Sequence, residues 1–442
     1  MTDADGQPVS VALVSLGCPK NLVDSEKMLA RLAEGRCVVG APMDDADVIV
    51  INTCGFLADA RDEAMGVIRE ALEYKASGRA SRVVVAGCMA QRNGDELFEQ
   101  APGIDAIVGV NDRDSILAAV LGESKSQVSS PSGSIGSDAG RFRLTPRHVA
   151  YLRIAEGCSH NCRFCTIPAI RGPFRSKAAD AVLAEAGELI ADGAVELNVI
   201  AQDTTSYGTD HGDVDLAGLL RRLDAMEGAT WIRLMYTYPR RFTDDLVAAI
   251  RDCENVVPYV DIPLQHISES VLGRMGRKVS RRRVEELLDS LRDAGVAIRT
   301  TFIVGLPGET EAEFAELLEF INDFEFDAMG VFAYSPEPGT PAAEMPDQVP
   351  DEVKAARVAA MMSAQQAIAF DVNEGSVGQT IDVLVDGIDE SGRCVGRHAG
   401  QAPEIDSVCI LTDPREVGRM VTVEVVGCDG YDLVVRPLSE ND

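Results

Sequence analysis

The sequence predicts an α/β protein with an N-terminal open parallel α/β domain, a partial (β/α)6 barrel and a C-terminal small antiparallel β-barrel. Over residues 8–121, and again over residues 141–373, apolar runs of strand length alternate with helical patterns, which is typical of parallel sheets. Over residues 376–438 helical periodicity is absent, and short β-type runs are separated by Gly and Asp turns.

The N-terminal domain, residues 8–121, opens with strand and helix patterns in alternation. Each of its first three expected strands is an apolar run that leads into a cysteine. The expected strands are residues 9–16, 47–52 and 82–86, the expected helices are residues 21–34 and 60–75, and two weaker repeats follow through residues 104–108 and 115–121.

Cys18, Cys54 and Cys88 are 36 and 34 residues apart, about one βαβ unit each. The carboxyl ends of parallel strands share one edge of the sheet, where ligands of open α/β sheets bind, so we expect the three thiols to converge. They either hold a three-cysteine iron–sulfur cluster with one open iron, or are small apolar residues at strand ends, because free cysteine is often buried. Cys37 fits no such position and is interpreted as structural.

Residues 122–140 separate the first two domains. The segment is rich in Ser and Gly, as in Ser-Ser-Pro-Ser-Gly-Ser at residues 129–134. This composition is typical of a flexible linker and predicts a domain boundary.

The second domain, residues 141–373, repeats the strand–helix alternation six times. The expected strands are residues 149–155, 195–201, 230–236, 257–262, 298–304 and 328–334, and the expected helices are residues 177–192, 215–226, 244–251, 281–294 and 311–324. Six units are fewer than the eight of a complete barrel, so the pattern predicts an incomplete one with its active site at the carboxyl ends of the strands.

Cys158, Cys162 and Cys165 follow the first of these strands in a C-x3-C-x2-C motif. The motif supplies three ligands and no fourth cysteine follows nearby, so a four-iron cluster held here keeps one iron open to a small molecule. The alternatives are a zinc knuckle completed by His160 and three unrelated buried thiols. We interpret His160 as a loop residue rather than a ligand.

This spacing resembles the signature of the radical S-adenosylmethionine (SAM) enzymes. In that family the open iron binds the amino and carboxylate groups of SAM, and the reduced cluster cleaves SAM to a 5′-deoxyadenosyl radical. Other strand-end residues are expected at the same edge of the barrel: Gln202, Asp203, Tyr236, Tyr238, Asp261, Gln265 and His266. Gly305 and Gly308 either allow close approach to SAM or form a tight turn before a helix.

The composition of the chain indicates the cellular compartment and the kind of partner to expect. The 442-residue chain has eleven cysteines, no signal-like N-terminus and no apolar run of membrane-spanning length, which predicts a cytoplasmic protein with reduced thiols and no membrane association. A formal net charge of −30 argues against nucleic-acid binding and favours a basic partner. The C-terminal barrel is itself acidic, which either attracts such a partner or keeps the domain soluble.

Almost the whole chain resembles the methylthiotransferase family, in which a radical SAM core lies between an N-terminal cluster domain and a C-terminal TRAM β-barrel. The matching N-terminal motifs are Ser-Leu-Gly-Cys-Pro-Lys-Asn (15–21), Asn-Thr-Cys-Gly-Phe (52–56) and Gly-Cys-Met (87–89). The matching core motifs lie at residues 151–158, 168, 171–172, 261–266 and 301–310.

The resemblance implies two [4Fe-4S] clusters, a sulfur-donating one on Cys18, Cys54 and Cys88 and a radical-generating one on Cys158, Cys162 and Cys165. SAM would serve as both methyl donor and radical source, and no catalytic residue is expected beyond the cluster ligands. An electron donor and a sulfur source would be partners. Candidate contacts to SAM are Phe164, Gln202, Arg233 and Gly305.

Within the family, Cys-Pro-Lys-Asn at residues 18–21 is similar to the ribosomal-protein branch, whereas the transfer-RNA branch tends towards Cys-Gln-Met-Asn. The expected substrate is the β-carbon of an aspartate in the basic small-subunit ribosomal protein S-twelve, and the acidic charge favours the same branch. The alternative is a transfer-RNA adenosine methylthiotransferase. A non-catalytic iron–sulfur carrier or scaffold and a conventional zinc protein are the other rivals.

Overall fold

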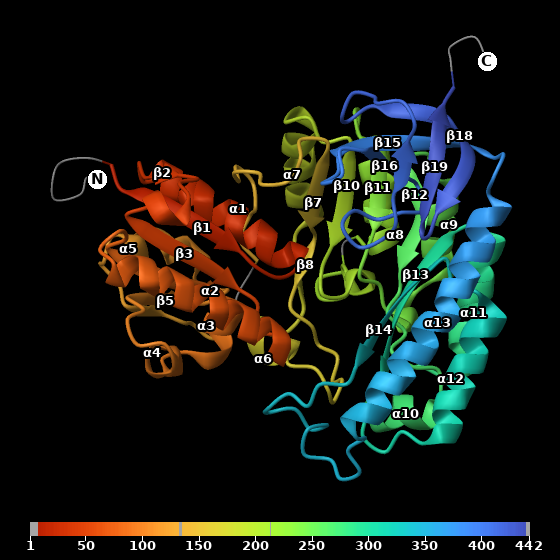
Figure 1. Cartoon of the computed structure of the whole chain (residues 1–442), viewed down its shortest axis with the longest axis horizontal. Coiled ribbons are helices and arrows are strands. Elements are labelled where there is room, and N and C mark those ends of the chain that lie inside the picture. The colour runs from red at the N-terminus through yellow and green to blue at the C-terminus, as the bar shows by residue number, and fades with distance from the viewer. Residues whose placement is uncertain (1–7, 132–134, 213, 439–442) are drawn as a thin grey trace.

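The computed structural model describes residues 8–131, 135–212 and 214–438 (Figure 1). Three main sheets follow one another along the chain: a six-stranded sheet near the N-terminus, a second six-stranded sheet, and a closed five-stranded barrel. The order and type of these sheets confirm the predicted fold class.

The N-terminal sheet is parallel throughout, with the strand order β2-β1-β3-β4-β5-β6. Its strands are β1 (Ser10–Ser15), β2 (Val38–Val39), β3 (Val48–Thr53), β4 (Arg82–Gly87), β5 (Ala106–Val108) and β6 (Ser126–Gln127). Its helices are α1 (Pro19–Glu34), α2 (Ala58–Ala76), α3 (Cys88–Asn93), α4 (Glu96–Gln100) and α5 (Ile116–Val120).

Helices cover both faces of this sheet, because alternate strand residues point to opposite sides. Val50 packs with Met28 of α1 and Ile116 of α5 in one buried cluster. Ile51, the next residue of β3, packs with Ile68 of α2 in another. The near-continuous apolar runs that predicted these strands are therefore explained by burial on both faces.

The segment predicted as a flexible linker, residues 122–140, differs from that expectation. Ser126–Gln127 extends the N-terminal sheet as β6, and Asp138 is buried with its carboxylate 2.6 Å from Arg153 of the second sheet. Serines 132 and 134 lie outside the described residues. Composition favoured a solvated linker, but the acidic side chain of Asp138 ties the segment to the core.

The second sheet is parallel and has its strands in chain order, which confirms the predicted partial barrel. Its strands are β7 (Val149–Arg153), β10 (Glu196–Ile200), β11 (Trp231–Leu234), β12 (Val256–Asp261), β13 (Ala297–Val304) and β14 (Ala328–Ala333). The helices of this region are α6 (Ile167–Arg171), α7 (Ala179–Ala191), α8 (Leu216–Asp224), α9 (Asp244–Asp252), α10 (Glu269–Arg274), α11 (Arg281–Asp293), α12 (Glu311–Phe324) and α13 (Asp351–Gly375). A short antiparallel pair, β8 (Ala155–Glu156) with β9 (Arg175–Ser176), flanks the cysteine loop.

The C-terminal barrel closes in the order β15-β16-β17-β19-β18. Its strands are β15 (Thr380–Ile388), β16 (Cys394–His398), β17 (Cys409–Leu411), β18 (Met420–Asp429) and β19 (Asp432–Pro437). The prediction of an antiparallel barrel needs one correction, because β17 and β19 pair in parallel. The barrel packs against the second sheet, where Leu384 joins Tyr151 and Tyr259 in one buried cluster (Figure 1).

Among the residues that the structure describes, four short 3-10 helices complete the elements, at Met43–Asp45, Arg113–Ser115, Thr204–Ser206 and Pro239–Arg241. Within the described part of the chain, no helix has the length and apolar character needed to cross a membrane.

Candidate functional site

The loop that carries Cys158, Cys162 and Cys165 forms one wall of a pocket at the carboxyl end of the second sheet. The pocket is also lined by Phe56, His160, Phe164, Ile167, Gln202, Asp203, Tyr236, Thr237, Tyr238, Pro263, Gln265 and Arg277. The loop is held closely at its start, because the amide of Cys158 donates to the carbonyl of Gly172 at 3.0 Å. Gly157 has a φ of +79°, and a Cβ there would lie 2.2 Å from the carbonyl oxygen of Pro173, so only glycine fits.

Burial favours the protonated form of two thiols of this loop, those of Cys158 and Cys165. It raises the pKa of Cys158 to about 11 and that of Cys165 to about 12. Arg277, with Nη1 4.0 Å from the sulfur of Cys162, places positive charge beside the loop and lowers the pKa of both buried thiols in part. Thiols of this kind release protons when a metal binds and supplies the compensating charge.

His160 does not complete a zinc knuckle in this arrangement. Its Nε2 lies 2.6 Å from a carboxylate oxygen of Asp203, and its ring stacks on Tyr238 with centroids 4.2 Å apart. Across residues 8–131, 135–212 and 214–438, no three His, Cys, Asp or Glu side chains are placed to share a single metal ion.

The structure also brings together Cys18, Cys54 and Cys88 at the carboxyl edge of the N-terminal sheet. Cys18 is the residue before α1, Cys54 follows β3, and Cys88 begins α3 directly after β4. The chain is closely packed there, since a Cβ on Gly17 would lie 2.9 Å from Cβ of Cys54, and one on Gly55 would lie 2.8 Å from the backbone of Cys88. The signal that predicted this convergence was the position of each cysteine after a buried strand.

The thiol of Cys88 is the most deeply enclosed of the three. Burial raises its pKa to about 12, and burial also raises the pKa of Cys54. As in the core triad, a bound metal would remove these protons.

Arg171 links the two cysteine triads. It ends α6, six residues after Cys165, and its Nη2 lies 3.3 Å from the sulfur of Cys88 and donates to Oδ1 of Asn21 at 2.6 Å. From the other side, Phe56 of the N-terminal domain lines the pocket of the core triad. The two triads therefore lie on either side of one short stretch of packed side chains.

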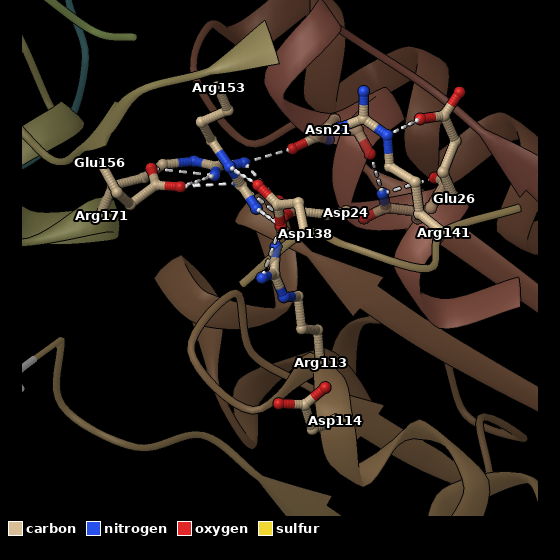
Figure 2. Close-up of polar contacts among 12 residues, drawn as sticks. Asn21, Asp24, Glu26, Arg113, Asp114, Asp138, Arg141, Arg153, Glu156 and Arg171 are labelled. Carbon is tan, nitrogen blue, oxygen red and sulfur yellow. Dashed lines mark hydrogen bonds and ion pairs between the residues drawn. The ribbon is translucent and has the colours of Figure 1, made fainter. Parts of the chain in front are cut away.

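Behind Arg171 is a buried network of charged residues, which we call the interdomain network (Figure 2). Asp24 of α1 accepts from Arg153 and Arg113 at 2.7 Å each, and Asp138 pairs with the same two arginines and with Lys177. The network also includes Glu156, Arg171 and Glu185. The network joins α1, the segment 122–140 and the second sheet, and so fixes the position of the N-terminal triad relative to the core.

We expect the Asp138→Asn substitution to lower the free energy of unfolding by about 3 kcal/mol, because it leaves three buried cations with too little negative charge. Urea unfolding of the apoprotein measures this. The matched control is Asp192→Asn, which also pairs with two arginines but is 46% exposed, so its effect should stay below about 1 kcal/mol. Equal effects of the two substitutions would contradict the role of the network.

Comparisons with known proteins agree with this arrangement. Three family models match the chain: "Uncharacterized protein family UPF0004" over residues 10–109, "Radical SAM superfamily" over residues 152–321 and "TRAM domain" over residues 377–437. The ribosomal protein uS12 methylthiotransferase RimO of Geobacter sulfurreducens is 42% identical over 97% of this chain and 98% of its own length. The protein of the same name from Anaeromyxobacter sp. is 44% identical over 98% of this chain and 94% of its own length. The chain belongs to the RimO family.

Among solved structures, the radical SAM methyltransferase TsrM of Kitasatospora setae matches with a TM-score of 0.54 over 76% of this chain and 77% of that one, at 16% identity. That likeness concerns the fold. Membership of the RimO family and the radical SAM superfamily makes the chain a radical SAM enzyme, which implies a [4Fe-4S] cluster and SAM as cofactors.

Of the predicted SAM contacts, Phe164 and Gln202 line the pocket of the core triad, whereas Arg233 and Gly305 are not among its lining residues. Arg233 is fully buried, with Nε donating to Glu196 at 2.7 Å and Nη1 to the carbonyl of Ala399 at 2.6 Å, so it joins the second sheet to the C-terminal barrel. At Gly305 an added Cβ would lie 2.3 Å from the side chain of Lys354, so the space beside this glycine is already filled.

Sequence reasoning missed two cations near the pocket, Arg277 and Lys20. Arg277 lies over the ring of Tyr238, with Cζ 4.5 Å from its centroid, and donates to the carbonyl of Pro263 at 2.7 Å. It sits in a basic Gly-Arg-Met-Gly-Arg-Lys stretch (273–278) that carries no positional signal of its own. Two pocket residues also have strained backbones, Tyr236 with φ of +57° and Gln265 with φ of +71°, as is common at functional sites.

Proposed function

We propose that this protein is a radical SAM methylthiotransferase that adds a methylthio group to the β-carbon of an aspartate in ribosomal protein uS12. The observation that carries the proposal is the placement of two three-cysteine groups on either side of Arg171 and Phe56. Relatives more than 40% identical along nearly their whole length are named as uS12 methylthiotransferases, which supports the choice of substrate.

In this proposal Cys158, Cys162 and Cys165 hold one [4Fe-4S] cluster and Cys18, Cys54 and Cys88 hold a second. The fit rests on the donor sets: each group has three thiols, and the pocket of the core group contains no fourth cysteine. When bound, such clusters supply reductive cleavage of SAM and transfer of sulfur, chemistry that acid–base side chains cannot perform on an unactivated C–H bond.

The side chains of this chain would position the reactants and exclude water. Phe164 and Gln202 are candidates for contacts to SAM, since both line the pocket beside the core cysteines. Gln202 is itself held in place, because its Nε2 donates to Glu156 at 2.6 Å. Arg171 places a permanent positive charge against the sulfur of Cys88. Phe56 and Tyr238 supply aromatic surface to the pocket of the core triad.

The wider assignment follows from the same proposal. The domain boundaries would be residues 8–121, 141–373 and 376–438, with the three sheets as their cores. The acidic chain suits a basic ribosomal protein in the cytoplasm, and an electron donor and a sulfur source complete the partners.

The test is mass spectrometry of ribosomal proteins and transfer RNA from a strain that lacks this gene. We expect uS12 to lose one methylthio increment on an aspartate while transfer-RNA nucleosides stay unchanged. An unchanged uS12 spectrum together with loss of a methylthioadenosine would overturn the proposal in favour of the transfer-RNA reaction.

A further inference from the structure

Lys20 is a buried cation between the two triads. It lies in the first turn of α1, two residues after Cys18, and is only 5% exposed. Its Nζ lies over the ring of Tyr236, 2.7 Å from the centroid, and Tyr236 lines the pocket that holds Cys158, Cys162 and Cys165. Lys20 therefore reaches from the N-terminal triad to the wall of the core pocket.

The carboxylates near Lys20 form ion pairs with arginines instead. Among the described residues no Asp or Glu forms an ion pair with it. Asp261 pairs with Arg299 at 3.3 Å, and Glu156 pairs with Arg153 and Arg171. Asp261, Glu156, Cys18 and Arg171 are the charged or titratable groups near Lys20.

Burying the amine of Lys20 without a carboxylate ion-pair partner costs free energy, so its place beside the pocket suits a group that binds an anionic ligand. The ligand must reach a point next to Tyr236, between the two groups of cysteines. A side-chain carboxylate fits this requirement. In aspartate the carboxylate carbon is bonded directly to the β-carbon, so a cation that binds the carboxylate also fixes the β-carbon.

We propose that the ammonium group of Lys20 binds the carboxylate of the uS12 aspartate and thereby holds the β-carbon between the two triads. This inference rests on the proposed function and names the residue that would select aspartate. Its rival is that Lys20 only balances the negative charge of the Cys18 thiolate, which would make its effect independent of the substrate side chain.

The test compares binding of two uS12 proteins to the anaerobic, SAM-loaded enzyme without reductant. One carries the modified aspartate, located by mass spectrometry, and the other carries an Asp→Asn change at that position. We expect Lys20→Met to weaken binding of the aspartate form about tenfold and to leave binding of the asparagine form unchanged, because only the former loses a charge-assisted hydrogen bond. Lys20→Arg should retain most of the preference for aspartate.

Equal loss for both uS12 forms, or no loss for either, would overturn the inference. Iron content of the variant serves as the folding control. If Lys20→Met loses its iron, the test uses the wild-type enzyme only. The wild-type enzyme should bind the aspartate form of uS12 about tenfold more tightly than the asparagine form, and equal affinities would overturn the inference. If the wild-type enzyme modifies uS12 but lacks this preference, the role of Lys20 is wrong and the proposed function stands. If the enzyme neither binds nor modifies uS12, both proposals are wrong.

Discussion

Replacing Cys158 with alanine should abolish reductive cleavage of SAM while the N-terminal triad keeps its iron. No other thiol can replace Cys158, because Cys158, Cys162 and Cys165 are the only cysteines among the described residues that line the pocket. The proposed pair of four-iron clusters predicts that the iron content falls from about eight to about four atoms per chain. The measurements are 5′-deoxyadenosine formed with excess reductant and iron per chain after anaerobic reconstitution.

The matched control is Cys253→Ala. Cys253 belongs to the same domain and is also partly buried, but it follows α9 and does not line the pocket. It should leave both SAM cleavage and iron content unchanged. Production of 5′-deoxyadenosine by Cys158→Ala at the wild-type rate would contradict the assignment of the core triad.

The second large effect is expected at Cys88. Cys88→Ala should abolish methylthio transfer to uS12 while SAM cleavage continues, because the substitution removes a ligand from the N-terminal triad and leaves the core pocket intact. Incubation with uS12, SAM and reductant, followed by the masses of uS12 and of 5′-deoxyadenosine, separates the two activities.

Cys37→Ala is the control for this variant, since Cys37 is a buried cysteine of the same domain that packs with Met28 and Leu32 of α1. It should retain transfer, with at most a modest loss of stability from the smaller side chain. Methylthiolated uS12 from Cys88→Ala would show that the N-terminal triad is not the source of the transferred group.

The strands and both cysteine groups could be predicted from the sequence for one physical reason. A parallel strand covered on both faces is an uninterrupted apolar run, and its carboxyl end lies at the edge where ligands bind. Cys54 after Val48–Thr53 and Cys88 after Arg82–Gly87 follow this rule. The relation of each cysteine to its strand is local, so the sequence alone could reveal it.

The interdomain network could not be predicted, because its members are far apart in the chain. Asp24 and Arg153 are 129 residues apart, and Asp138 lies in a Ser- and Gly-rich segment whose composition indicates a solvated linker. The contacts of Arg233, a predicted SAM contact, could not be predicted for a related reason. Its position on a strand was correct, but its partner Ala399 belongs to a barrel more than 160 residues away.

The central claim, that this chain transfers a methylthio group to uS12 with two cysteine-bound clusters, is tested most directly by the mass of uS12 in cells lacking the gene. The strain is complemented with the wild-type gene, with Cys88→Ala or with Cys37→Ala. The account predicts that the wild type and Cys37→Ala restore one methylthio increment on an aspartate and that Cys88→Ala does not. Restoration by Cys88→Ala, or a uS12 mass that never changes, would contradict it.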